Sequence, residues 1–142
     1  MNLADQRELM LRFSRCQFAF RHTDYDKADC VGLVRKVMAD FAHVELPWPP
    51  TDENDWKDYL DILPWPVDEL QEFDILFIAA NNRHRLVDHV ACHLGNDYIV
   101  HFPRQSFGVI CERYHRLAPK ILRVGRCKKN EIYSQRTSAR AA

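Results

Sequence analysis

The segment from residue 88 to residue 102 constrains the fold of this chain most strongly, because its apolar residues can be buried together in only one strand register. The segment reads DHVACHLGNDYIVHF, two alternating runs separated by Gly, Asn and Asp, which is typical of a β-hairpin. A two-residue turn at Gly95-Asn96 would place the apolar side chains of the two strands on opposite faces. A three-residue loop at 95–97 gathers six apolar side chains on one face and pairs Leu94 with Tyr98, so this register is predicted.

The predicted register also brings two histidines together on the other face of the hairpin. Ala91 pairs with His101, so His89 becomes the diagonal neighbour of His101, with Cβ atoms about 7 Å apart or less. Long side chains reach each other across that distance. The alternative is that they are two unrelated polar residues on a solvated sheet face.

The rest of the chain places helices before antiparallel strands, an order typical of the α+β class. Apolar residues at helical spacing predict a helix over about 5–15 and a second over about 30–42, with Asp29 as the N-cap of the second. Alternating or apolar runs predict strands at 75–78, 87–94, 97–102, 107–112 and 120–125, with a turn at 81–84. We therefore expect helices packed on an antiparallel sheet.

Residues 43–72 differ from the rest in composition. They contain five of the seven prolines, all three tryptophans, and nine acidic residues against one basic residue. A short helix is expected over 52–63, between the two Trp-Pro pairs. Two interpretations stay open: a long connection that packs its tryptophans on the body, or an insertion that forms one wall of a binding cleft.

Length and composition indicate one globular domain. The 142 residues, of which 46% are hydrophobic and 28% charged, suit a domain at 1–125 followed by a basic, flexible tail at 126–142. No uncharged stretch approaches the roughly 20 residues of a membrane helix, and the first fifteen residues lack the apolar block of a signal peptide. We expect synthesis in the cytoplasm and no membrane partner. Because the body is nearly neutral, nucleic acid is not an expected partner either.

The cysteines argue for a nucleophile and against a disulfide or metal framework. Five are present, an odd number, without any CxxC pair. A zinc site is also disfavoured because the register points Cys92 away from the histidines. Cys30 differs from the others because it follows Asp29 at a predicted helix start, where backbone N–H groups and the helix dipole lower a thiol pKa. The alternative is a buried structural cysteine, but a helix-start cysteine followed by two co-facial histidines fits a nucleophile, a base and an orienting group.

These motifs resemble those of the NlpC/P60 cysteine peptidases. DCVGLV at 29–34, FDILF at 73–77, HVACHLGN at 89–96 and VH at 100–101 occur in the order that the family has. The resemblance spans about residues 18–125 and is closest to the phage-tail or phage cell wall peptidase subgroup. It implies a papain-like α+β core, in which the helix that bears the cysteine packs on the antiparallel sheet that bears the histidines.

The resemblance also implies roles for individual residues. Cys30 corresponds to the nucleophile, His89 to the general base and later acid, and His101 to the residue that orients His89; Asp29 and Phe18 correspond to substrate contacts. The implied reaction is hydrolysis of peptidoglycan stem peptides, between γ-D-glutamate and meso-diaminopimelate, without a metal or organic cofactor. Phage tail proteins are the implied partners, and the virion tail the implied location.

The sequence departs from the family pattern at several positions near the expected site. The family usually has an aromatic residue and two glycines before the cysteine, whereas this chain has Arg21 and His22 in place of the glycines. Phe18 stands where a tyrosine contacts substrate, Val31 replaces a serine, and Phe73 replaces the glycine of a Gly-Asp pair. These departures keep the three catalytic positions but leave the scissile bond open.

Two other functions remain compatible with the sequence. The chain could be an assembly or binding protein at a tail tip that keeps the fold and cleaves little or nothing. It could also be a papain-like toxin or acyltransferase with a substrate other than murein. The intact set of Cys30, His89 and His101 favours an enzyme over a scaffold.

Overall fold

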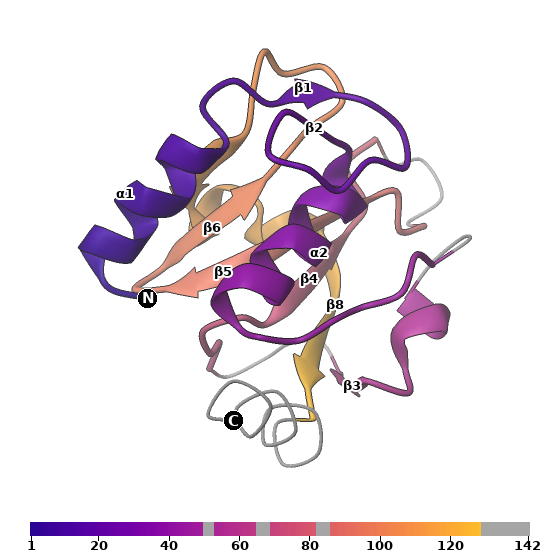
Figure 1. Ribbon diagram of the computed structural model, residues 1–142. Coiled ribbons are helices and arrows are strands. Elements are labelled where there is room, and N and C mark those ends of the chain that lie inside the picture. The colour runs from indigo at the N-terminus through magenta and orange to yellow at the C-terminus, as the bar shows by residue number, and fades with distance from the viewer. Residues whose placement is uncertain (50–52, 65–68, 82–85, 129–142) are drawn as a thin grey trace, which may run out of the picture.

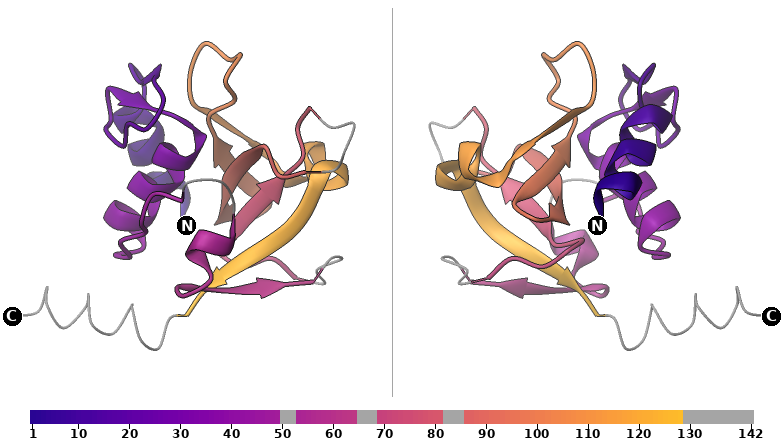
Figure 2. Two further views of the ribbon diagram at one scale, coloured as in Figure 1. Left: turned by 90° about the vertical axis from the view of Figure 1, so that its right-hand side faces the viewer. Right: turned by 90° about the vertical axis from the view of Figure 1, so that its left-hand side faces the viewer.

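The computed structural model describes residues 1–49, 53–64, 69–81 and 86–128. Two helices, α1 (Leu3–Arg12) and α2 (Cys30–Phe41), pack on a six-stranded antiparallel sheet (Figure 1). Figure 2 shows both helices on the same side of that sheet. The predicted α+β class is confirmed. In the described part of the chain, no helix has the length and apolar character needed to cross a membrane.

The sheet has the strand order β3-β8-β4-β5-β6-β7, and each neighbouring pair is antiparallel. Its strands are β3 (Leu60–Leu63), β4 (Ile75–Ile78), β5 (His89–Gly95), β6 (Tyr98–His101), β7 (Ile110–Arg113) and β8 (Ile121–Cys127). A separate parallel pair is formed by β1 (Gln17–Phe18) and β2 (Lys27–Ala28). Short 3-10 helices are η1 (Glu53–Trp56), η2 (Tyr114–Arg116) and η3 (Ala118–Lys120).

The sheet is buried on both faces. One face packs against α2, whose buried apolar residues Leu33, Val34, Val37 and Met38 meet β5 and β6. The opposite face forms a second apolar cluster with residues of η2 and the segment that follows it, including Tyr114 and Leu117. The buried residues of that second cluster are Leu76, Ile78, Ala91, Ile99, Ile121 and Val124. Because both faces are covered, the interpretation of the histidines as residues on a solvated face is wrong.

The β5–β6 hairpin has the predicted register next to the histidines and a different turn. Ala91 pairs with His101 as expected, but Gly95 pairs with Tyr98, and the register shifts between His93 and Gly95. The loop is therefore the two residues Asn96-Asp97, both with positive φ, at 53° and 65°. A two-residue turn with two left-handed residues suits Asn and Asp, and a bulge next to Gly95 (φ 84°) absorbs the extra residue. The expected three-residue loop is wrong, although the apolar face is preserved.

Two other predicted boundaries are also wrong. The helix expected over 52–63 is a short η1 followed by β3, the edge strand, in which Leu60 pairs with Cys127. The expected domain end at 125 cuts through β8, since Arg126 lies in that strand and forms a two-pronged ion pair with buried Asp74 at 2.9 Å. Local apolar alternation at 60–63 competes with the Trp-Pro signals that favour a helix there. Trp65, the turn at 82–84 and the tail at 129–142 lie outside the described residues.

Candidate active site

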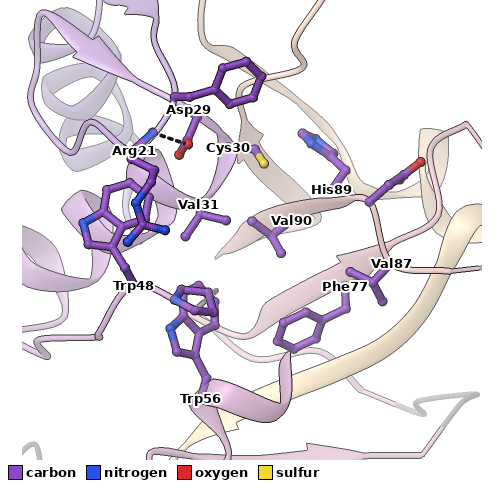
Figure 3. Close-up of a pocket in the computed structure, with 13 residues that line it drawn as sticks. Arg21, Asp29, Cys30, Val31, Trp48, Trp56, Phe77, Val87, His89 and Val90 are labelled. Atoms are coloured by element: carbon purple, nitrogen blue, oxygen red, sulfur yellow. Dashed lines mark hydrogen bonds between the residues drawn. The ribbon is translucent and has the colours of Figure 1, made fainter. Parts of the chain in front are cut away.

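Cys30 is the first residue of α2, and Asp29 caps that helix as predicted. The side chain of Cys30 lines two cavities, and His89 lines both of them as well. One, of about 420 Å³, has Trp48, Trp56 and Phe77 in its walls and is called the aromatic cavity below. Figure 3 shows Cys30 and His89 toward one end of this cavity and the two tryptophans toward the other. The second cavity, of about 730 Å³, has Arg104 and Lys120 in its walls and is called the basic cavity.

The two predicted histidines meet and continue into a carboxylate. Nε2 of His89 lies 2.8 Å from Nδ1 of His101, and Nε2 of His101 lies 2.6 Å from Oε2 of Glu112. Both histidines are buried, with 8% and 3% of their surfaces exposed. The three residues come from β5, β6 and β7, so the sheet register holds all three side chains in line.

Glu112 is a member of this site that sequence reasoning missed. Ile99 pairs with Glu112 and His101 pairs with Ile110, which makes Glu112 a diagonal neighbour of His101 on one face of the sheet. The strand expected at 107–112 contains this residue, but local signals do not set the register of that strand against the preceding one. Continuing the register across the 102–109 connection would have provided the missing signal.

The hydrogen-bond chain selects one proton arrangement. A carboxylate only accepts hydrogen bonds, so Nε2 of His101 carries a hydrogen and donates it to Glu112. In a neutral His101 the other nitrogen, Nδ1, is then an acceptor, and Nε2–H of His89 donates to it. This leaves Nδ1 of a neutral His89 with a free lone pair. The arrangement therefore prepares His89 to accept a proton at Nδ1.

Burial keeps both histidines neutral. It lowers the pKa of His89 to about 4, with the charge of His101 as a second cause. Burial also lowers the pKa of His101, against the hydrogen bond to Glu112, which raises it. A neutral imidazole at moderately acid and neutral pH is the form that a general base requires.

Burial also raises the pKa of Cys30 to about 11, against hydrogen bonds from backbone N–H groups, of which that of Val90 is the strongest. The expectation that the helix start lowers the pKa of this thiol is therefore wrong, because desolvation outweighs the helix N-terminus. At rest the site holds a neutral thiol and a neutral imidazole. The thiolate must then form by transfer of the thiol proton to His89.

Asp29 lies in the site, but both of its carboxylate oxygens already accept hydrogen bonds from backbone N–H groups. Its Oδ1 accepts the N–H of Gly32 and its Oδ2 accepts the N–H of Arg21, both at 2.7 Å. It is buried, with 7% of its surface exposed, and lines the aromatic cavity. A Cβ at Gly32 would lie 1.8 Å from the carbonyl oxygen of His22, so the loop presses directly on the helix start. Asp29 therefore joins this loop to the helix that carries Cys30.

Two residues that replace glycines of the NlpC/P60 pattern have a left-handed backbone. Arg21 has φ 59° and Phe73 has φ 68°. This conformation costs a residue with a side chain about 1–2 kcal/mol relative to the right-handed one. At Arg21 the hydrogen bond to Asp29 offsets the strain, and at Phe73 burial of the ring does so. The loops thus keep conformations that glycine adopts freely.

Phe18, expected as a substrate contact, lines the basic cavity from β1. Its ring packs edge-on against Phe20 at 5.3 Å and against Phe102 at 5.2 Å. It has no hydroxyl to offer a substrate. Phe18 therefore contributes an apolar surface and support for its neighbours.

Trp48 and Trp56 of the 43–72 segment pack on the body and also form a wall of the aromatic cavity. Trp56 is buried and donates its ring N–H to the carbonyl oxygen of Pro47 at 2.7 Å. Trp48 is half-buried, with the guanidinium groups of Arg35 and Arg21 at 4.5 and 5.2 Å from its ring. The two interpretations of this segment are thus compatible in the structure.

Metal ligands do not gather in the part of the chain that the structure describes. No group of three or more His, Cys, Asp or Glu side chains there could hold a metal ion. Cys92 belongs to the apolar cluster next to α2, whereas His89 and His101 bond to each other and to Glu112. The groups gathered at His89 are two imidazoles and a carboxylate, and the thiol of Cys30 lines the same cavities as His89.

Comparison with known proteins identifies this arrangement. The NlpC/P60 family model matches residues 15–124. The fold is similar to the NlpC/p60 domain of the peptidoglycan hydrolase SagA, with TM-score 0.61 and 18% identity, covering 87% of this chain and 97% of that one. NlpC2 from Trichomonas vaginalis gives TM-score 0.61 at 17% identity, covering 84% of this chain and 44% of that one. An NlpC/P60 family protein from Bacillus cereus ATCC 10987 gives 0.60 at 19% identity, with coverages of 78% and 35%.

These structural likenesses show the fold alone, and this chain spans less than half of the last two proteins. Comparison with curated proteins gave no match. The family model, in contrast, covers most of the chain, from before the Cys30 helix to β8. Its range includes Cys30, His89, His101 and Glu112. The chain therefore belongs to the NlpC/P60 family.

Proposed function

We propose that this protein is a cysteine endopeptidase that hydrolyses peptidoglycan stem peptides, with Cys30 as nucleophile and His89 as general base. One observation carries the proposal: Cys30 shares two cavities with a histidine whose Nε2 is engaged by His101 and whose Nδ1 is free to accept a proton. A peptide carbonyl that enters either cavity meets both groups. Family membership and the fold shared with the peptidoglycan hydrolase SagA support the substrate class.

The proposed reaction follows from the proton arrangement. Cys30 transfers its thiol proton to Nδ1 of His89 as the sulfur attacks the carbonyl carbon and forms a tetrahedral intermediate. Backbone N–H groups at the start of α2 are available to stabilise its oxyanion. His89 then returns the proton to the leaving amine, the C–N bond breaks, and a thioester remains. Water, deprotonated by His89, hydrolyses the thioester and restores the thiol.

Glu112 and His101 stabilise the charged form of His89 during this cycle. When His89 becomes an imidazolium, its Nε2–H hydrogen bond to His101 strengthens, and the negative charge of Glu112 lies at the far end of the chain. The group contacting the substrate is His89, so His101 and Glu112 are positioning residues. Their contribution depends on keeping the tautomer described above.

We further propose the bond between γ-D-glutamate and meso-diaminopimelate as the scissile bond, and a role in a phage or prophage tail. Both rest on the resemblance of DCVGLV at 29–34 and of the hairpin motif to the corresponding family motifs. A tail-tip assembly protein with little activity is the scaffold alternative. An effector with a substrate other than murein is a second candidate, favoured by the aromatic cavity, whose Trp48, Trp56 and Phe77 rings suit an apolar group.

Digestion of purified sacculi tests the proposed function. Sacculi of both murein chemistries, with diaminopimelate or lysine at the third position, are incubated with the protein, and the released fragments are identified by mass spectrometry. We expect fragments cut after γ-D-glutamate with the unaltered protein and none with Cys30→Ala. Absence of any fragment that depends on Cys30 would contradict the peptidase proposal.

A further inference from the structure

The basic cavity holds two cations beside the reacting groups. Arg104 and Lys120 line it together with Cys30, His89 and His101. Both cations are exposed, and neither forms an ion pair within the described ranges of the chain. Because Asp88 is the one acidic residue described in the same lining, the wall of the cavity carries an excess of positive charge.

The one acidic group described in this wall, Asp88, forms no ion pair with either cation in the described part of the chain. Asp88 lines the cavity, but its Oδ1 accepts the N–H of Ala80 at 2.6 Å and its Oδ2 accepts the N–H of Asn81 at 2.9 Å. Its carboxylate is thus held by the backbone after β4. The two cations therefore outnumber the one described carboxylate of the wall, and neither is paired with it.

Arg104 is held in place by a row of aromatic rings. Its guanidinium lies 4.9 Å from the centre of the Phe20 ring, which packs edge-on against Phe18, which in turn packs against buried Phe102. The loop after Arg104 is also closed, because the hydroxyl of Ser106 donates to the carbonyl oxygen of Pro103 or Gly108, each at 2.8 Å. The guanidinium is thus pre-positioned, which lowers the entropy lost on binding a ligand.

The backbone of Lys120 is also fixed by hydrogen bonds. It ends η3 directly before β8, its carbonyl oxygen accepts the N–H of Ala79, and its N–H donates to Leu117, both at 2.9 Å. The flexible part is therefore the side chain alone. A planar guanidinium and a mobile ammonium in one cavity suit a carboxylate, which accepts several charge-assisted hydrogen bonds.

We infer that Arg104 and Lys120 form an anion-binding subsite that holds a carboxylate of the substrate in the basic cavity, which Cys30, His89 and His101 also line. The inference rests on the proposed function and names a requirement of it: the substrate carries a free carboxylate close to the scissile bond. Next to that bond in a stem peptide two groups have this chemistry, the α-carboxylate of γ-linked D-glutamate and the free carboxylate of diaminopimelate. The cations make the protein selective for free-acid over amidated stems.

Binding to the inactive Cys30→Ala protein tests the subsite without relying on turnover. Three synthetic stem peptides are compared by calorimetry: the free acid, a form amidated at D-glutamate, and a form amidated at diaminopimelate. We expect one amidated form to bind about three- to tenfold more weakly than the free acid. The form that binds weakly identifies which carboxylate occupies the subsite.

Charge-removing variants then assign the effect to the cavity. In the Cys30→Ala protein, a further Arg104→Gln or Lys120→Gln change should weaken binding of the free acid by about three- to tenfold. The affinity for the amidated form that already binds weakly should stay unchanged. Arg7→Gln, an exposed arginine of α1 that lines neither cavity, is the matched control and should change nothing. Phe20→Leu should weaken free-acid binding less than Arg104→Gln, because it removes only the support of the guanidinium.

The two proposals fail in different ways. Equal binding of acid and amidated peptides, no binding of any of them, or a preference that survives both Gln variants would overturn the subsite. The expected pattern of binding, combined with no cleavage of the same peptides by the unaltered protein, would uphold the subsite and overturn the peptidase function. The expected pattern together with Cys30-dependent cleavage supports both.

Discussion

The half of the site that carries the nucleophile is built differently from the half that carries the base. Cys30 is placed by local backbone: Asp29 bridges two N–H groups, and Gly32 admits the carbonyl of His22. His89 is placed by side-chain hydrogen bonds across three strands. Changes to the backbone contacts around Cys30, as distinct from its sulfur, should therefore act through folding stability. Changes behind the base should act through proton transfer, with the fold intact.

The largest effect is expected where the two halves meet. Cys30→Ala and His89→Ala should each lower kcat by several orders of magnitude, because nucleophile and base act as one unit. The melting temperature of Cys30→Ala should stay near that of the unaltered protein, since only one sulfur is lost from the wall of a cavity. Turnover of a stem peptide measures kcat, and a thermal melt measures the melting temperature. The double variant should be no worse than either single variant, and additive losses would show that the residues act separately.

The pH dependence of stability should reveal the buried base. The pKa of His89 in the folded protein is about 4, below its ordinary value of 6.5, so the unfolded chain binds more protons between these pH values. Folding stability should therefore be complete above pH 6.5 and fall as the pH drops toward 4, by about 3 kcal/mol from this group. Urea unfolding at pH 7 and pH 4.5 measures the loss. His89→Asn should show a smaller loss, and an equal loss in both proteins would contradict the neutral, buried state of His89.

Glu112→Gln should separate orientation from stability in the histidine half. The amide can donate a hydrogen bond to His101, which reverses the tautomer chain and turns Nδ1 of His89 into a donor. We expect kcat to fall about a hundredfold with little change in KM or melting temperature. His101→Asn should lower kcat less than Glu112→Gln does, because asparagine can still accept the Nε2–H hydrogen bond of His89 and so keep its tautomer. Glu8→Gln, at an exposed ion pair on α1, is the control, and an unchanged kcat in Glu112→Gln would remove Glu112 from the mechanism.

Gly32→Ala should lower folding stability by disturbing the backbone around Cys30. The added Cβ would lie 1.8 Å from the carbonyl oxygen of His22, so the loop must move away from the helix start. A loss of about 1–3 kcal/mol in the free energy of unfolding is expected, with activity falling as the loop shifts. Gly108→Ala, where nothing lies within 4 Å of an added Cβ, is the control for urea unfolding. Equal stability of the two variants would show that the loop does not press on the helix.

The same contrast explains what could be predicted from the sequence. The cap at Asp29 is a local signal, and the meeting of His89 with His101 follows from burying one face of a hairpin. Glu112 requires the register across the 102–109 connection, where neither apolar alternation nor a tight turn constrains it. The raised pKa of Cys30 depends on how deeply tertiary packing buries the thiol, which local signals at the helix start do not contain. The edge strand β3 was missed because its four residues lie inside a segment dominated by proline and tryptophan.

The most direct test of His89 as the base is the pH profile of Cys30 alkylation by iodoacetamide, followed by mass mapping. With His89 as base, a neutral thiol reacts through proton transfer to the imidazole, so the rate should be level over a range that begins near pH 5 and fall as His89 is protonated near pH 4. Above that range the rate rises again, as the pH approaches the thiol pKa of about 11. In His89→Ala the plateau should disappear, and the rate should rise only as the pH approaches the thiol pKa of about 11. Identical profiles for the two proteins would contradict the central claim that His89 activates Cys30.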